Sequence, residues 1–353
     1  MSSYLNRNLA IDWIKGLMIF IIVLYHSSYS QGIRGYLGVD VFFYISGYFL
    51  MSSFLRKPTT AIKYTWDRIK KIAAPFLICI LLAGGIMLIH VLTTTGSYSS
   101  FVDTTGKIFS AIPFASEFGG EFTRAYFIIG YWFLSVLIIS SFILYAMLEY
   151  DEHLSTAILF PIIILLGYNT LLCDAPSLNS LSRIGPLGAP LIRGCCEMAA
   201  GAMICHVYSN YKSCIESHAT LINVLGIISL LIFAALLFTQ EALDKYTIIT
   251  IPWILLASVM DHSWLNVALN RIKFGIFTWI GRYTLYIYCI HGPIQTRVQG
   301  INDHYLHGAL NGASLLAVDL VAIAAASFAL YYLCQFITRF INARANQPDH
   351  TRL

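Results

Sequence analysis

Ten long apolar runs dominate this sequence and restrict what the chain can fold into. A lipid-spanning helix needs about 17 to 25 consecutive, mostly apolar residues. Runs of this kind cover approximately 9–30, 36–55, 72–92, 126–148, 154–172, 189–208, 219–239, 246–260, 274–296 and 313–341. Charged residues make up 11% of the 353 residues, against about a quarter in soluble domains. The sequence therefore predicts an all-α, polytopic membrane helix bundle of about ten transmembrane helices, with residues 1–353 forming one integral-membrane domain.

The basic residues of the loops predict the orientation of this bundle, because Lys and Arg accumulate in cytoplasmic loops. A basic cluster lies between the second and third spans: Arg56, Lys57, Lys63, Arg68, Lys70 and Lys71. The segment 93–125 is rich in Thr, Ser and Gly and has few basic residues, as expected of a loop outside the cell. With ten spans, both termini then lie in the cytoplasm.

Three ionisable side chains lie on one face of the first span. At about 100° per residue, Lys15 and His26 lie roughly 20° apart around the helix, and Asp12 and His26 about 40° apart. Ionisable groups in a membrane helix are costly unless they face protein or water, so this stripe is expected to line a cavity. Alternatively, Asp12 and Lys15 form an i,i+3 ion pair, and the charged ends reach the two membrane surfaces.

Polar residues of other spans are predicted to lie at the depth of His26. On the predicted orientation, His26, Asp40, Trp132 and His291 each lie a few residues inside the outer end of their span. Lys15 lies about 16 Å closer to the cytoplasm. A histidine is suited to removing a proton from a hydroxyl near neutral pH. Asp40 can fix its tautomer and stabilise the imidazolium, or it can cap the second span.

The remaining polar side chains of the spans also have more than one interpretation. His291 either binds the molecule that carries the reacting hydroxyl or hydrogen-bonds to the backbone. Trp132 stacks on a sugar ring or anchors the chain at the membrane surface. Arg193 and Glu197 are i,i+4 neighbours and are expected to pair with each other. The eight cysteines have no paired spacing, and no zinc-binding or phosphate-binding motif is present, so no metal is expected.

Several stretches carry a likeness to one known family. They are Lys15 followed after ten residues by His26, the run 35–48 (GYLGVDVFFYISGY), the run 68–75 (RIKKIAAP), and later landmarks at 131–134 and 281–293. These stretches resemble the multispan membrane acyltransferases called acyltransferase family 3. The opening 10–16 is most similar to the branch that acetylates fucose and other cell-surface sugars. Many relatives carry Arg where Lys15 stands.

The resemblance implies a membrane O-acyltransferase that moves an acetyl or other acyl group from cytoplasmic acyl-CoA to a hydroxyl of a cell-surface sugar. It implies acyl-CoA, membrane lipid and a surface glycan or lipid-linked sugar as partners, with no nucleic acid. The implied location is the bacterial cytoplasmic membrane.

Roles for individual residues follow from this hypothesis. The CoA phosphates dock near Arg68, Lys70 and Lys71, and Lys15 orients the polar arm of the carrier. His26 deprotonates the acceptor hydroxyl with Asp40 as its partner, and Trp132 and His291 contact the acceptor. Two alternatives stay open: the basic cluster also follows from topology alone, and the acyl group can pass directly or through an acylated His26.

Two other classes of protein compete with the enzyme. A transporter or flippase for a glycolipid or a small polar substrate would use the same polar stripe. The sequence shows neither an inverted repeat nor a pair of broken helices, which argues mildly against transport. A structural or partner-binding membrane protein would not need three charged groups on one buried stripe.

Overall fold

The computed structural model describes residues 8–27, 32–94, 97–111, 131–174, 178–179, 182–184, 187–271 and 275–345. Nearly all of this part of the chain is helical. Its elements are α1 (Leu9–His26), α2 (Leu37–Arg56), α3 (Ala61–Thr94), α4 (Tyr98–Ala111), α5 (Tyr131–Tyr150), α6 (Glu152–Leu154), the π-helical η3 (Ser155–Leu159), α7 (Phe160–Asp174), β1 (Arg183–Ile184), β2 (Leu187–Gly188), α8 (Ala189–Asn210), α9 (Lys212–Ser217), α10 (Ala219–Leu236), the 3-10 helix η4 (Glu241–Tyr246), α11 (Thr247–Val259), α12 (Trp264–Arg271), α13 (Ile276–Arg282), α14 (Thr284–His304) and α15 (Gly312–Ala345). The two strands form a short antiparallel hairpin.

The prediction of an all-α, polytopic membrane protein is confirmed. Among the described residues, eight helical segments are long and apolar enough to cross a membrane. Many large apolar side chains point outward, such as Leu165, which is 71% exposed, and Leu231, which is 66% exposed. An apolar outer surface on helices is what lipid requires. The count of ten spans and the cytoplasmic side of both termini stay predictions.

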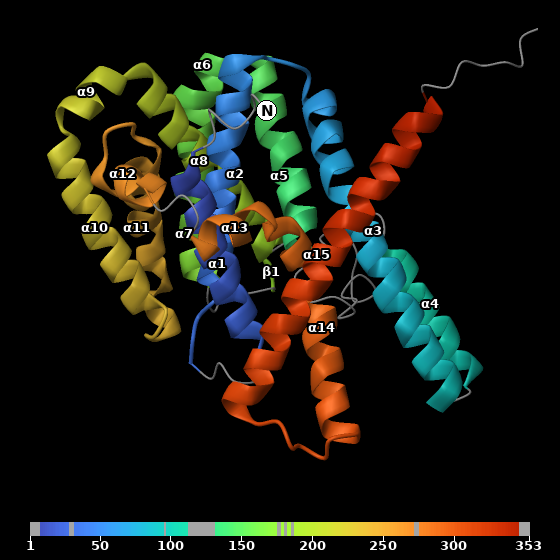
Figure 1. Ribbon diagram of the computed structural model, residues 1–353. Helices are drawn as coiled ribbons and strands as arrows, with labels where there is room; N and C mark the ends of the chain where they lie inside the picture. The colour runs from blue at the N-terminus through green and yellow to red at the C-terminus, as the bar shows by residue number, and fades with distance from the viewer. Residues whose placement is uncertain are drawn as a thin grey trace, which may run out of the picture.

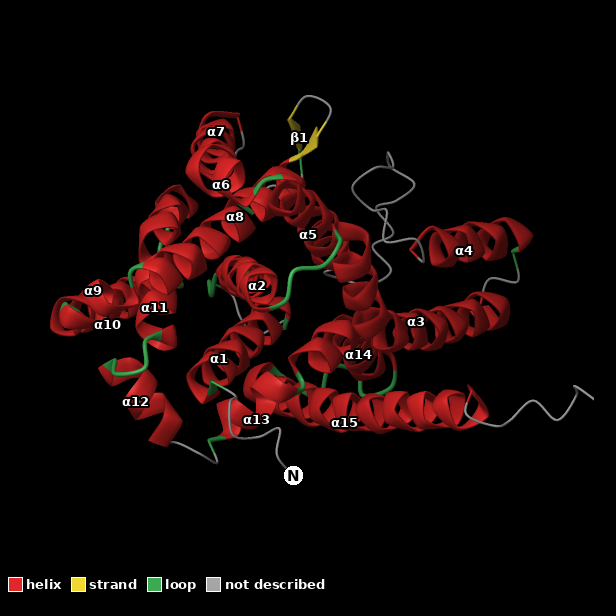
Figure 2. Ribbon diagram, turned by 90° about the horizontal axis from the view of Figure 1, so that it is seen from above, coloured by secondary structure: helices red, strands yellow, loops and turns green. Residues whose placement is uncertain are grey.

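Helices α1 and α2 lie inside the bundle (Figure 2). Helix α2 is surrounded by α1, α5, α8 and α11, whereas α3, α14 and α15 form a second group to one side. In Figure 1, α1 begins and α15 ends on the upper side of the view, where the connection from α2 to α3 also lies. We call this side the basic end, because that connection carries the basic cluster 56–71.

Two reciprocal pairs of glycines set the tightest helix crossings. A Cβ atom at Gly47 of α2 would collide with the backbone of Met198 of α8, and one at Gly201 of α8 would collide with the backbone of Tyr44 of α2. Helices in lipid associate through such small residues because burial of apolar surface against another helix gives little stabilisation in a medium that is itself apolar. The α2–α8 crossing is therefore fixed at backbone contact.

The second crossing joins α1 to α13. Gly16 of α1 lies against the backbone of Phe277, and Gly281 of α13 lies against the backbone of Asp12. Since the larger number on α1 meets the smaller number on α13, the two helices run in opposite senses. The backbone of α13 is thus held against the first half of α1.

The predicted span 274–296 differs from the structure. It is divided into α13 and α14, and the peptide N–H of Tyr283 donates to the Ile280 carbonyl at 2.9 Å in the tightened last turn of α13. Figure 1 shows α13 lying across the bundle and α14 turning away from it. The predicted loop 93–125 also contains helix α4, and residues 95–96 and 112–125 of that loop lie outside the described residues.

The start of α1 is fixed by a polar cap. The Asn8 side chain accepts hydrogen bonds from the peptide N–H groups of Ala10 and Ile11, and it donates to the Ser258 carbonyl at 3.0 Å. An asparagine at this position satisfies N–H groups that have no partner within the helix. The cap therefore ties the start of α1 to the end of α11.

Candidate active site

His26 and His291 form a pair of neighbouring imidazoles. His26 is the last residue of α1, and His291 lies near the middle of α14. Their ring centroids are 5.3 Å apart. His291 is fully buried, and its Nδ1 lies 2.9 Å from the Tyr288 carbonyl oxygen and 3.3 Å from that of Ile287. Both neighbours are acceptors, so Nδ1 carries the proton and Nε2 carries the lone pair.

Two buried acceptor atoms at this pair have no hydrogen-bond partner within the described part of the chain. They are Nε2 of His291 and Oε1 of Gln295. The two residues are i,i+4 on α14 and so lie on one face of the helix. The Gln295 amide donates to the Val23 carbonyl at 2.9 Å, one turn before His26, and this bond joins α14 to α1. Buried polar atoms are nearly always paired, so two free acceptors beside two histidines indicate a place for a ligand with donor groups.

A row of aromatic rings continues from the histidine pair into the bundle. The His291 ring lies 5.7 Å from that of Tyr288, which lies 5.2 Å from that of Phe133. Trp132 is 6.4 Å from Phe133 in a perpendicular arrangement. Two rings therefore separate Trp132 from the nearer histidine. Within the described part of the chain, Trp132 belongs to the same aromatic row, and no ring contact joins it to either histidine.

Asp40 has a different partner from the one predicted. Its carboxylate accepts a hydrogen bond from the Arg193 guanidinium, and both side chains are buried. The guanidinium also donates to Glu197 at 3.3 Å, as the i,i+4 spacing predicts, and to the Tyr36 carbonyl at 3.4 Å. A buried guanidinium needs carboxylates around it, because an uncompensated charge is very costly there.

This arrangement bears on both expectations for Asp40. Its carboxylate contacts Arg193, and its role as the partner of His26 stays a prediction. It is not the cap of α2, since α2 begins after Tyr36 without a side-chain cap. Sequence spacing alone does not find the contact, because Arg193 lies 153 positions away on another helix.

A second ion pair holds the segment before α2. Arg34 donates to Asp244 at 2.6 Å, and the Tyr36 hydroxyl donates to the same carboxylate at 2.5 Å. The Tyr36 ring lies 5.5 Å from that of Tyr25, which lies 4.9 Å from the His26 ring. These residues connect His26 to η4 through aromatic contacts.

Lys15 lies on α1 between the histidine pair and the basic end. Its Nζ is 3.5 Å from the Asp12 carboxylate, which confirms the i,i+3 pair named as one alternative. The Asp12 side chain is buried, whereas that of Lys15 is 25% exposed. Eleven residues separate Lys15 from His26, about 16 Å along the helix. That the stripe lines a cavity stays a prediction.

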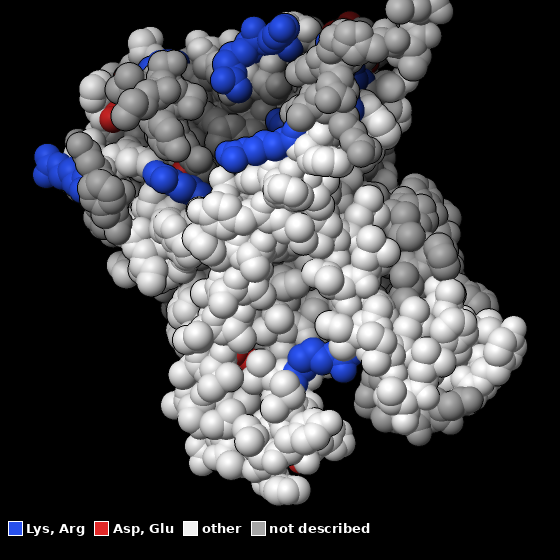
Figure 3. All heavy atoms as spheres, turned by 45° about the vertical axis from the view of Figure 1, so that its right-hand side comes forward, with Lys and Arg blue, Asp and Glu red and all other residues white. Residues whose placement is uncertain are grey.

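The basic cluster forms the wall of a cleft at the basic end. The cleft has a volume of about 610 Å³ and is lined by Phe49, Ser53, Arg56, Lys57, Pro58, Thr59, Lys63, Tyr64, Asp67, Arg68 and Lys71. Five basic side chains therefore face one acidic side chain. Figure 3 shows Lys and Arg atoms gathered around a hollow at this end of the molecule. Concentrated positive charge in a concave site favours an anionic ligand.

The three cluster residues singled out from the sequence have different surroundings. Arg68 lines the cleft and donates to the Ser141 hydroxyl at 2.9 Å. Lys71 lines the cleft and is exposed. Lys70 is not part of the cleft wall: its Nζ lies 3.4 Å from Asp67 and 5.8 Å from the ring centroid of Trp66. The structure brings two of the three to one site.

The fold and these sites define a class of protein. It is a multispan membrane helix bundle with a cationic cleft at one end and a histidine pair on two other helices, α1 and α14. On α2, the Phe43 ring lies 4.7 Å from that of Phe133 in the aromatic row. Phe43 and Ser53 of the cleft are ten residues apart, about 15 Å. Such an arrangement is suited to handling a charged ligand at one side and a polar ligand within the bundle.

Similarity to known proteins gives the family. The family model for the acyltransferase domain of acyltransferase family 3 matches residues 8–339. The chain is also similar to a protein of Komagataeibacter xylinus that carries the provisional name membrane-bound transacylase BcsY, with 37% identity over 75 residues. That match covers 21% of the chain and 19% of the relative's length. No solved structure matches.

Because the matched region extends over nearly the whole chain, the protein belongs to acyltransferase family 3. It is an integral multi-pass membrane protein.

Proposed function

We propose that the protein takes an acyl group, in the first place acetyl, from acyl-CoA at the basic cleft and transfers it to a hydroxyl of a cell-surface sugar. The observation that carries the proposal is the pair of free acceptors, Nε2 of His291 and Oε1 of Gln295, beside His26. A sugar hydroxyl is a hydrogen-bond donor and supplies what these atoms lack. The provisional name of the bacterial relative, a membrane-bound transacylase, agrees with acyl transfer.

The donor would bind with its phosphates in the cleft. Arg68 is held by Ser141 and faces the cleft together with Lys71, so both present charge to phosphate oxygens. Bonds between a basic side chain and a phosphate are strengthened by charge. The pantetheine arm then extends along the bundle past Lys15 towards the histidine pair.

The transfer step would use His26 as general base. Its imidazole takes the proton of the acceptor hydroxyl, and the oxygen attacks the thioester carbonyl carbon. The C–S bond breaks, and the CoA thiolate leaves and receives the proton. The products are an ester on the sugar and free CoA thiol. In this arrangement His291 is the neighbour of His26, and its Nε2 accepts a hydrogen bond from the acceptor and so holds it beside the base.

The test uses membrane vesicles that contain the protein, acetyl-CoA labelled in the acetyl group, and surface glycan from the host cell. Free CoA thiol and label in the glycan are both measured. His26→Ala should lower the rate by about 10²- to 10⁴-fold, the usual contribution of a general base. His153→Ala is the matched control, because His153 is exposed on α6.

Two results would overturn the proposal. One is a His26→Ala protein that is inserted normally and acetylates glycan at the wild-type rate. The other is movement of a glycolipid across the vesicle membrane without release of CoA thiol, which is what a transporter or flippase would produce.

A further inference from the structure

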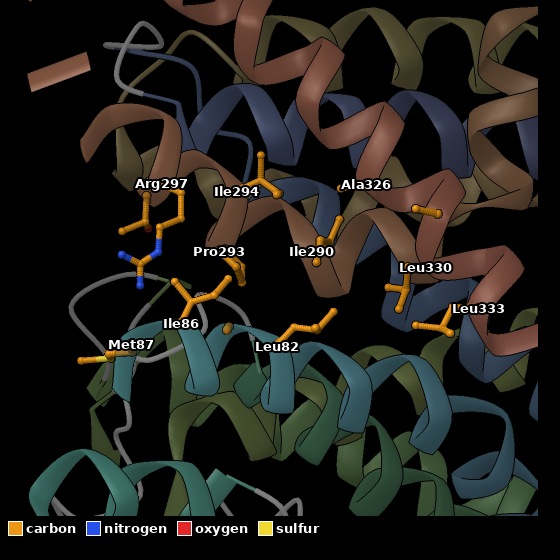
Figure 4. A pocket seen from close by; sticks show the side chains of 13 residues that line it. Leu82, Ile86, Met87, Ile290, Pro293, Ile294, Arg297, Ala326, Leu330 and Leu333 are labelled. Carbon is orange, nitrogen blue, oxygen red and sulfur yellow. The ribbon is translucent and has the colours of Figure 1, made fainter. Parts of the chain in front are cut away.

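A second cavity lies on the outer face of α14, the helix that carries His291. A groove of about 530 Å³ lies between α3, α14 and α15, and Figure 4 shows the side chains that line it. Helix α3 contributes Leu82, Ile86 and Met87, and helix α15 contributes Leu330 and Leu333. The volume falls within the range of about 300–1,000 Å³ that is usual for small-molecule sites.

The groove opens towards lipid. The walls include Leu82, which is 50% exposed, and Ile86, which is 48% exposed. Both residues lie on α3, one of the helices long and apolar enough to span a membrane. A hydrocarbon chain is the natural occupant of an apolar groove at this surface, since it buries the apolar walls without leaving a polar group unpaired.

One charged side chain lines this apolar groove. Arg297 of α14 is half-buried, and in Figure 4 its guanidinium extends from α14 at one end of the row of apolar side chains. Within the described part of the chain, no carboxylate lies within 4.0 Å of it and no acceptor forms a hydrogen bond with it. A guanidinium at the edge of lipid that has no partner among the described residues is available to an anionic group, and phosphate matches its geometry.

The position of Arg297 fits the headgroup of a lipid in the outer leaflet. Arg297 lies seven residues before the end of α14, about 10 Å along the helix, and that end faces away from the basic end. From Arg297 the groove continues past Pro293 to Ile290, deeper in the bundle. The groove therefore has its charge at the outer end and its apolar walls towards the middle. A membrane lipid has its phosphate and its hydrocarbon chain in the same order.

We propose that this groove binds a phosphate-bearing membrane lipid, with one hydrocarbon chain between α3, α14 and α15 and the phosphate on Arg297. The site is separate from the histidine pair, because Arg297 and His291 are six residues apart and lie on different faces of α14. Ile290 forms part of the groove wall and directly precedes His291, so the lipid packs against the helix that positions this histidine. The proposal does not depend on the acyl-transfer reaction.

The first experiment measures binding to the full chain, purified in detergent and stripped of lipid. The probes are phosphatidylglycerol, diacylglycerol with the same chains, and glycerol 3-phosphate, and the readout is the affinity from native mass spectrometry. Phosphatidylglycerol should bind about 10- to 100-fold more tightly than diacylglycerol, as expected for hydrogen bonds to a charged group. Glycerol 3-phosphate alone should not bind.

Matched variants separate the phosphate contact from the groove. Arg297→Gln should lower the affinity for phosphatidylglycerol to about the affinity for diacylglycerol. Arg339→Gln, at an exposed arginine of α15, should leave the affinity for phosphatidylglycerol unchanged. Ala329→Phe should fill the groove and weaken both lipids, whereas Ala325→Phe, on α15 outside the groove, should not. The proposal is refuted if Arg297→Gln keeps the full preference or if glycerol 3-phosphate binds as tightly as the lipid.

A second measurement does not require a variant. Phosphatidylglycerol with a photoreactive group in one chain is added to wild-type protein, and the labelled peptides are sequenced. The expected labels fall on 82–87 of α3 and 326–333 of α15. Labels that are confined to other helices would overturn the assignment.

Discussion

Replacement of Asp40 by asparagine separates a structural role of this carboxylate from a catalytic one. Asp40, Arg193 and Glu197 form a buried group in which one guanidinium lies between two carboxylates, and each side chain is at most 2% exposed. In Asp40→Asn the guanidinium keeps Glu197 as its counter-charge and keeps an oxygen acceptor at position 40. The expected loss is that of one charge-assisted hydrogen bond, about 1.5–3 kcal/mol of the free energy of unfolding.

Replacement of the guanidinium itself should cost more. Arg193→Met leaves two buried carboxylates without a cation, and breaking a buried pair costs about 3–5 kcal/mol. At roughly 2 °C per kcal/mol for a chain of this size, the unfolding midpoint should fall by about 3–6 °C for Asp40→Asn and by about 6–10 °C or more for Arg193→Met. Asp67→Asn is the control, because it breaks an exposed pair with Lys70 that is worth about 0–1 kcal/mol.

The assay combines thermal unfolding in detergent with the rate of CoA release per folded molecule. When a carboxylate that orients a catalytic histidine is replaced by an amide, the kcat of the enzyme falls about 10⁴-fold. Since Asp40 contacts Arg193 and not His26, folded Asp40→Asn should keep a kcat close to that of the wild type. A protein with an unchanged midpoint and a loss of about 10⁴-fold in kcat would refute the reasoning. So would an Arg193→Met protein that is as stable as Asp40→Asn.

Two further predictions concern the cleft and the helix crossings. Lys71→Gln should raise KM for acetyl-CoA by about tenfold, the effect of one charged phosphate contact. The neighbouring Lys70→Gln should leave KM unchanged because that side chain pairs with Asp67, and equal effects of the two would contradict the cleft assignment. Gly201→Leu should lower the yield of folded protein, since its side chain meets the backbone of α2. Gly85→Leu, with open space around it, should not, and a stable Gly201→Leu protein would contradict the crossing.

The helices could be predicted from the sequence because lipid imposes one rule on every span. Apolar runs long enough to cross a bilayer must be helical, so each predicted range is mostly helical in its described part. Pairs within one helix follow from the same periodicity, as Lys15 with Asp12 and Arg193 with Glu197 show. Helix α4 was not predicted, because its Thr- and Ser-containing sequence does not resemble a span.

For residues on different helices, the sequence predicted only that they lie at the same depth in the membrane, not that they touch. Distances from the ends of the spans predict that His26 and His291 lie in one leaflet, and the structure brings their rings to 5.3 Å. The same reasoning placed Asp40 at that depth, yet its side chain faces α8 and Arg193. Depth along a helix does not give the direction in which a side chain points, and that direction depends on which helices are neighbours.

The division of the predicted ninth span is what allows the two histidines to meet. Gly281 of α13 lies against Asp12, and Gly16 lies against Phe277, so α13 runs along α1 in the opposite sense. An unbroken helix would carry His291 past the start of α1 and away from His26. The chain instead changes direction at Tyr283, and α14 then passes the end of α1, where Gln295 bonds to Val23. Gly281 lies in the last turn of α13, two residues before the division, so the residue that permits the close α1–α13 contact also stands where the helix ends.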